Sequence, residues 1–182
     1  NLAIVSWAIG LFLFNTTKEY SLFGIRLAFA SVSCIAYFLY CFSWLLVFEN
    51  KTQAPVKKAL LALPCLILTY LALFTNYIAR DVRFFSWGAD AVYGNLYYLF
   101  VVYFFIYIVL ALMILVKGYI RSVGVKRSQL KYLFLGFLLA VIAASFTNLI
   151  IPIFTGRSFL SKFGPLASIF FIGFVSYAII KY

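Results

Sequence analysis

Long apolar runs separated by short polar segments account for nearly the whole chain. Most of these runs reach the length of about 20 residues that an α-helix needs to cross a bilayer. The pattern predicts an all-α fold, a polytopic membrane helix bundle in which residues 1–182 form a single domain. The predicted spans cover residues 2–14, 21–48, 59–79, 96–116, 132–154 and 164–181.

The first run is the shortest, because only residues 2–14 precede the polar turn at Lys18 and Glu19. We expect this span to be truncated at Asn1, since the chain begins with asparagine rather than methionine. The last run still has a helical pattern where it reaches Tyr182. We therefore expect a segment of a longer protein, with seven spans in the parent if another helix precedes Asn1.

The polar segments between the runs predict the connections. Pro55 stands at a position typical of a helix start, and Pro64 predicts a bend in the first turns of the third span. Residues 80–95 combine charged residues with Trp87 and glycines, which indicates an outer loop lying on the membrane interface. Residues 155–163 predict a short turn before the last span.

The composition excludes an ordinary water-soluble domain, because 66% of the residues are hydrophobic, 10% are charged and the mean hydropathy is +1.09. Fifteen basic and four acidic residues give a net charge of +11. In a soluble protein this charge would suggest nucleic acid. Here the basic residues lie between apolar runs of spanning length, so we expect contact with anionic lipid head groups and no nucleic acid.

The segment Lys117–Lys131 is rich in basic residues and contains no acidic residue. By the positive-inside rule it belongs on the cytoplasmic face, and the other connections follow by alternation. This predicts a multi-pass protein of the plasma (inner) membrane with Asn1 and Tyr182 both cytoplasmic. The cytoplasmic side then also holds Lys51, Lys57, Lys58 and Lys181, and the outer side holds Lys18, Arg26, Arg80, Arg83, Arg157 and Lys162.

Catalytic and metal-binding patterns are absent from the sequence. It contains no histidine, and Cys34, Cys41 and Cys65 lie inside apolar runs without a Cys-x-x-Cys pair, so neither a zinc site nor a disulfide framework is expected. All acidic residues lie at the ends of spans or in loops, which excludes a carboxylate pair or proton relay inside the membrane. We expect no enzyme activity, no cofactor and no metal in this segment.

Uncharged polar residues concentrate in the outer halves of the predicted spans. If the stripes that they form converge, they line an outward-open pocket with aromatic walls, as expected for a small ligand. Asn148 is the best single candidate, because Pro152 frees a carbonyl group at the same position. The candidate ligand-binding residues are Arg26, Ser33, Tyr37, Thr69, Asn76, Tyr98, Ser145 and Asn148.

A different interpretation of these residues stays open. Serine, threonine and asparagine side chains commonly form hydrogen bonds between helices of a membrane bundle. Arg26, near the start of the second span, is placed to extend its side chain to the outer head groups. Tyrosine side chains are enriched at membrane interfaces without any role in ligand binding.

Several short stretches match a known pattern: 126–132 (Lys-Arg-Ser-Gln-Leu-Lys-Tyr), Gly136, 164–166 (Gly-Pro-Leu), 177–182 (Tyr-Ala-Ile-Ile-Lys-Tyr), 26–30 (Arg-Leu-Ala-Phe-Ala) and 75–76 (Thr-Asn). With these stretches the chain resembles the N-terminal seven-transmembrane sensor region of bacterial membrane histidine kinases. The resemblance covers the whole chain and is most specific from Lys126 to Tyr182. It implies a missing first helix before Asn1, and homodimerisation.

The resemblance also implies an output module. In that family the last span leads into cytoplasmic signalling modules, usually a phospho-accepting helix pair and an ATP-binding kinase domain, and sometimes a cyclic-dinucleotide synthase. Because this segment contains no histidine, it does not hold the phospho-acceptor.

These observations lead to the hypothesis of a membrane sensor input domain. It would detect a small apolar or amphipathic ligand, or the state of the bilayer, and relay it through the last helix to the output module. The alternative is a transporter or channel subunit for a hydrophobic substrate, which the lack of an internal repeat and of intramembrane acidic residues disfavours. A scaffold that only anchors and dimerises its output domain would share the same sequence features.

Overall fold

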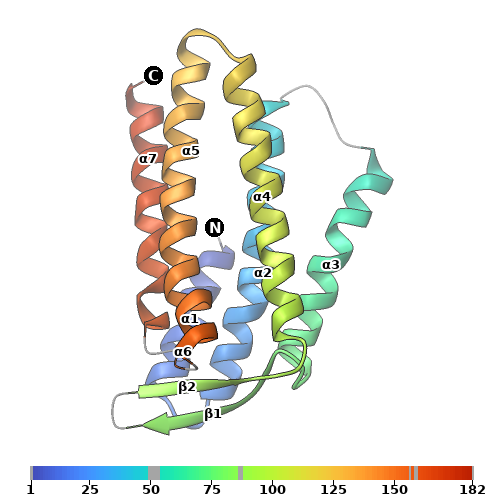
Figure 1. Cartoon of the computed structure of the whole chain (residues 1–182), viewed down its shortest axis with the longest axis vertical. Helices are drawn as coiled ribbons and strands as arrows, with labels where there is room; N and C mark the ends of the chain where they lie inside the picture. Colours follow the sequence, from blue (N-terminus) through green and yellow to red (C-terminus); the bar gives the residue numbers. More distant parts are fainter. Residues whose placement is uncertain (1, 49–53, 86–87, 156, 158–159, 182) are drawn as a thin grey trace.

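The computed structural model describes residues 2–48, 54–85, 88–155, 157 and 160–181. The predicted positions of Lys51, Trp87 and the terminal residues Asn1 and Tyr182 lie outside this range. The helices run side by side in an elongated bundle, with a β-hairpin across one end (Figure 1). The elements are α1 (Leu2–Thr16), α2 (Ser21–Val47), α3 (Pro55–Phe74), β1 (Ala79–Phe85), β2 (Gly88–Tyr93), α4 (Tyr97–Arg121), α5 (Gly124–Ser145), the π-helical turn η1 (Phe146–Ile150), α6 (Ile151–Thr155), the 3-10 helix η2 (Ser161–Ala167) and α7 (Ser168–Lys181).

Helix length and composition confirm the expected polytopic membrane bundle. Within the described residues, four helical stretches are long and apolar enough to cross a bilayer, namely Ser21–Val47, Pro55–Phe74, Tyr97–Arg121 and Gly124–Thr155. Two shorter apolar helical stretches, Leu2–Thr16 and Phe163–Ala178, complete the set. The hairpin and the start of α2 lie at one end of the bundle, and the connection between α4 and α5 and the chain's C-terminal end lie at the other (Figure 1).

The observed helix ends differ from the hydropathy pattern in three places. The third helix runs from Pro55 to Phe74 rather than over 59–79, because Pro55 provides a helix start and Thr75 is extended. The basic segment is not a loop, since α4 continues to Arg121 and α5 begins at Gly124. The 3-10 helix η2 begins at Ser161, within the expected turn at 155–163, and α7 begins at Ser168 rather than at 164. Hydropathy misses helix ends that project beyond the apolar layer.

Helices α1 and α2 pack with their backbones in contact. A Cβ atom added at Gly10 would lie 2.7 Å from the Gly24 carbonyl oxygen and 2.8 Å from the Ala28 nitrogen. A Cβ at Gly24 would lie 2.6 Å from the Phe14 nitrogen. Small residues at helix crossings allow such close approach in membranes, where packing rather than the hydrophobic effect drives association. This contact fixes α1 as one wall of the bundle interior.

The expected outer interfacial loop contains two paired antiparallel strands, β1 and β2, which form a hairpin. Ala79 pairs with Tyr93 and Phe85 with Gly88, with an irregularity between Ala79 and Asp81. The Lys18 ammonium group lies 5.8 Å from the centre of the Phe84 ring, which ties the hairpin to the turn between α1 and α2. The hairpin therefore covers one end of the helix bundle (Figure 1).

Helix α5 does not end cleanly but passes through the π-helical turn η1 into α6. The Ile151 backbone N–H donates to the Phe146 carbonyl, five residues back, which defines the wider turn. Pro152 follows in α6 and has no N–H to donate, so it leaves a backbone carbonyl one turn earlier without its helical partner. Such turns are rare and often occur at functional sites. Here the turn carries Asn148.

Candidate functional site

A narrow cavity of about 130 Å³ lies in the interior of the bundle. Helices α1, α2, α4, α5 and α7 contribute to its walls, together with the hairpin strand β2 and the turns η1 and η2. The side chains are almost all apolar. The lining residues are Ile4, Trp7, Leu11, Ile25, Ala28, Phe29, Val32, Ile35, Leu39, Tyr93, Phe100, Phe104, Ile108, Phe137, Ala140, Val141, Ala144, Asn148, Leu149, Ser161, Ala167, Ser168 and Phe171.

The cavity is elongated along the helix axes. On α2 its lining extends from Ile25 to Leu39, which at 1.5 Å per residue corresponds to about 20 Å. On α5 and η1 the lining extends from Phe137 to Leu149. A volume this small over this length describes a thin channel between helices rather than a rounded chamber.

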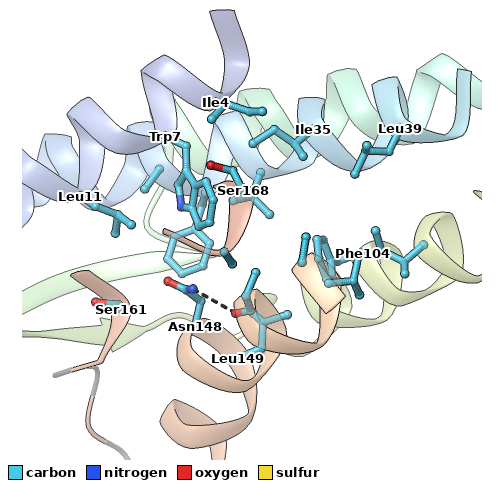
Figure 2. Close-up of a pocket in the computed structure, with 18 of the residues that line it drawn as sticks. Ile4, Trp7, Leu11, Ile35, Leu39, Phe104, Asn148, Leu149, Ser161 and Ser168 are labelled. Carbon is cyan, nitrogen blue, oxygen red and sulfur yellow. Dashed lines mark hydrogen bonds between the residues drawn. The ribbon is translucent and has the colours of Figure 1, made fainter. Parts of the chain in front are cut away.

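The polar side chains of the lining gather toward one end. In Figure 2, Asn148 and Ser161 lie toward one side of the cavity, and Leu39 and Phe104 lie on the other. The Asn148 side-chain nitrogen donates to the Ala144 carbonyl at 3.0 Å and to the Thr147 hydroxyl at 2.8 Å. Both donor hydrogens are thereby used, and the carboxamide oxygen accepts no hydrogen bond from the described residues.

The two serines at this end differ in their partners. The Ser168 hydroxyl donates to the Pro165 carbonyl at 2.6 Å. The Ser161 side chain is only 5% exposed, and its hydroxyl has no hydrogen-bond partner among the described residues. An unpaired buried polar group costs about 1–3 kcal/mol. Ser161 is therefore a polar group in the cavity wall with unused bonding capacity.

Tyr93 connects the hairpin to the cavity wall. Its ring lies 6.3 Å from the Phe29 ring and stacks on the Tyr97 ring at 4.0 Å between centres. Burial raises the pKa of the Tyr93 phenol above its usual value, so this side chain stays neutral at physiological pH. At the hairpin, the cavity is lined by an uncharged aromatic side chain.

Of the eight predicted ligand-binding residues, the structure places Asn148 alone in the cavity lining. Arg26 and Asn76 come together elsewhere, because the Arg26 guanidinium donates to the Asn76 side-chain oxygen and, at 3.4 Å, to the Ala79 carbonyl. Arg26 thus binds the segment that leads into the hairpin instead of extending freely to head groups. These two residues hold the hairpin on α2.

Ser33, Tyr37 and Thr69 lie in a second group where α2, α3 and α4 meet, outside the cavity. The Tyr103 hydroxyl donates to the Ser33 carbonyl at 2.9 Å, and the Cys34 sulfur lies 3.6 Å from the Thr69 hydroxyl oxygen. The Tyr37 ring lies 6.3 Å from the Tyr107 ring. The Thr69 side chain thus links α3 to α2, as the helix-bridging interpretation expects. The Ser33 hydroxyl instead donates to the Phe29 carbonyl of its own helix at 3.2 Å.

The two remaining candidates lie apart from both groups. Tyr98 is 66% exposed on the outer surface of α4. Ser145 is buried at the end of α5, where its hydroxyl has no partner among the described residues, yet it does not line the cavity. The rotation of a helix about its axis decides whether such a side chain faces the cavity. The pattern of polar residues in the sequence does not reveal this rotation.

Sequence reasoning missed most of the cavity wall. Trp7, Phe29, Phe104 and Phe171 are apolar residues in a chain that is rich in aromatic side chains, so nothing in the sequence marks them as lining rather than core. Ser161 carried a weak signal, because it is a polar residue in the expected turn just before the last span. Its burial, and the lack of a hydrogen-bond partner among the described residues, become visible only in the structure.

Comparison with protein families matches the chain, over residues 1–182, to the family described as the N-terminal 7TM region of histidine kinase. The chain belongs to this family. The match confirms the resemblance seen in the sequence and agrees with the multi-pass helical fold. Members of the family form the membrane sensor part of a histidine kinase and not its catalytic part. Comparison with curated proteins and with solved structures finds no match.

Proposed function

We propose that this segment is the input domain of a histidine kinase-like receptor that detects a small apolar or amphipathic ligand in the central cavity. The ligand changes the position of α7, which passes the change to a cytoplasmic output module of the same parent chain. The observation that carries the proposal is that α7 itself lines the cavity, through Ser168 and Phe171. A ligand in the cavity therefore touches the helix nearest the chain's C-terminal end.

Contacts along α7 support a relay. The Phe171 ring lies 6.3 Å from the Phe137 ring of α5 and 6.1 Å from the Phe42 ring of α2. Closer to the chain's end, the Tyr177 ring lies 4.9 Å from the Tyr132 ring of α5. A shift of α7 at the cavity must therefore change its packing on α5 along its length.

Gly136 brings α5 and α7 close together. A Cβ added at this position would lie 2.5 Å from the Phe174 Cβ. Tightly packed helix pairs move between discrete arrangements rather than deform continuously. A coupling of about 1–3 kcal/mol between cavity and output would change the output about 5- to 150-fold.

The charge distribution supports the proposed orientation. The connection between α4 and α5 lies at the same end of the bundle as the C-terminal end of α7, opposite the hairpin (Figure 1). Lys117 and Arg121 stand near the end of α4, and Lys126 stands in the first turn of α5. By the positive-inside rule this end faces the cytoplasm. The hairpin then lies on the outer face, and the output module follows α7 on the inner face.

The test uses the natural full-length protein reconstituted in lipid nanodiscs. Autophosphorylation is measured while a panel of hydrophobic compounds is titrated, in the wild type, in Phe171→Ala and in the control Ile172→Ala. Ile172 lies beside Phe171 on α7 but is 54% exposed and does not line the cavity. The proposal expects a compound whose effect on the wild type is lost in Phe171→Ala and kept in Ile172→Ala. Equal responses in the two variants would contradict a relay through the cavity face of α7.

A transporter remains the competing function, and the same nanodisc preparation distinguishes it. A carrier moves its substrate from one side of the membrane to the other, whereas a sensor binds it without net transport. Liposomes that accumulate or release a bound compound through this protein would favour the transporter.

A further inference from the structure

The cavity has an apolar channel and a polar end, and this division points to one class of ligand. We infer that it binds an uncharged single-chain amphiphile, such as a long-chain alcohol, with its polar group at Asn148 and Ser161 and its alkyl chain directed toward Leu39. This inference deepens the proposed sensor role and rests on it only for the effect on output. Binding itself is a separate claim and is tested separately.

The shape of the cavity selects one extended chain. A volume of about 130 Å³ is distributed over the lining from Ile25 to Leu39 on α2, a rise of about 20 Å. A phospholipid with two acyl chains is too wide for such a channel, and a fused-ring molecule is too rigid. A single alkyl chain fits because it is thin and flexible.

The polar end supplies hydrogen bonds that nothing in the described structure uses. The Ser161 hydroxyl is buried and lines the cavity without a partner among the described residues. The Asn148 carboxamide donates both of its hydrogens to α5 and η1, which leaves its oxygen as an acceptor. Figure 2 shows this oxygen on the side of Asn148 that faces Ser161. A ligand hydroxyl can donate to Asn148 and accept from Ser161.

The lining excludes an ionised head group. None of the described residues that line the cavity carries a charge. Arg26, next to Ile25 of the wall, has its guanidinium bound to Asn76 and Ala79. A carboxylate or ammonium group would lose its hydration in the cavity without gaining an ionic partner. The ligand's head group is therefore polar but neutral.

The ligand enters the cavity from the bilayer, and this limits which interactions can make the cavity selective for one amphiphile over another. A single-chain amphiphile partitions into the bilayer, where its chain is already shielded from water. Moving the chain into the cavity gains little hydrophobic free energy, because lipid tails are as apolar as the cavity wall. Discrimination must come from the head-group hydrogen bonds and from the fit of the chain length. Binding should reach an optimum at one chain length rather than increase steadily with it.

The experiment measures binding with a diazirine analogue of tetradecanol, photo-crosslinked to the natural full-length protein in nanodiscs. Unlabelled octanol, tetradecanol, octadecanol and tetradecanoate compete, at a pH where the acid is ionised. Ser161→Ala should weaken competition by tetradecanol about fivefold, the effect of one lost hydrogen bond. Ser145→Ala is the matched control, because Ser145 is equally buried and unpartnered among the described residues but does not line the cavity.

The expected result is crosslinking to cavity residues, an optimum among the alcohols, weak competition by tetradecanoate and a loss of affinity in Ser161→Ala alone. Equal affinity for tetradecanol and tetradecanoate would overturn the inference that the ligand's head group is uncharged. Identical behaviour of Ser161→Ala and Ser145→Ala, or crosslinks only on the lipid-facing surface, would overturn the binding pose. Specific binding without any change in autophosphorylation would leave the site standing and contradict the sensor function.

Discussion

The carboxamide of Asn148 lies against the backbone of Gly164, and its nitrogen occupies the space that a side chain at position 164 would need. This contact joins the π-helical turn η1 to the 3-10 helix η2. It fixes the orientation in which Asn148 donates to Ala144 and Thr147. Gly164 therefore supports the polar end of the cavity without lining it.

Gly164→Ala should displace the Asn148 side chain. Overpacking of this kind costs about 1–3 kcal/mol, so we expect a lower unfolding temperature in detergent and weaker ligand binding. Gly173→Ala is the control, because nothing lies within 4 Å of a Cβ at Gly173 on α7. In the control, alanine favours the helix by about 1 kcal/mol. A Gly164→Ala protein as stable as the Gly173→Ala protein would contradict the contact.

Gly24→Leu should separate α1 from α2. The Cβ of any side chain at Gly24 would lie 2.6 Å from the Phe14 nitrogen, and backbone atoms cannot move aside as a flexible side chain can. We expect α1 to detach and the cavity wall at Trp7 to open, which hydrogen exchange of α1 amides would report. Phe12→Leu serves as the control, since Phe12 is 65% exposed on α1. Unchanged exchange in Gly24→Leu would show that the two helices are not in backbone contact.

Arg26→Leu should loosen the hairpin. The substitution removes the hydrogen bonds from Arg26 to Asn76 and Ala79, and bonds from a charged donor contribute about 1.5–3 kcal/mol, less where water has access. We expect faster proteolysis within residues 79–93. Arg80→Leu removes an exposed positive charge of the same hairpin and is the control. Equal cleavage rates in the two variants would contradict this role of Arg26.

The helices could be predicted from the sequence, whereas the contacts between them could not. Apolar runs identify spans because composition alone decides whether a segment enters the bilayer. The hairpin was missed because strand pairing between β1 and β2 depends on distant contacts, such as Arg26 with Ala79, that no local pattern encodes.

The same distinction applies to the candidate site. Asn148 could be found because asparagine is rare in an apolar run and because Pro152 follows it. Ser33 and Tyr98 were grouped with Asn148 by their depth in the membrane, but the structure places Ser33 outside the cavity lining and Tyr98 on the outer surface of α4. Rotation is set by packing of whole helices and cannot be derived from one stripe of residues.

The proposed orientation is tested by chemical labelling of whole cells. A membrane-impermeant thiol reagent should modify Arg83→Cys, on the exposed face of the hairpin, in intact cells. It should modify Ser122→Cys, between α4 and α5, only after the cells are permeabilised. The opposite pattern would reverse the topology and place the basic segment outside.

The central claim is that a ligand in the cavity controls output through α7, and filling the cavity tests it most directly. Ala140 of α5 lines the cavity, while its neighbour Leu139 is 38% exposed and does not. Autophosphorylation of the full-length protein is measured during a tetradecanol titration in Ala140→Phe and Leu139→Phe. We predict that Ala140→Phe holds output at a fixed level whatever the tetradecanol concentration, and that Leu139→Phe responds as the wild type does. A normal response in Ala140→Phe would contradict the account.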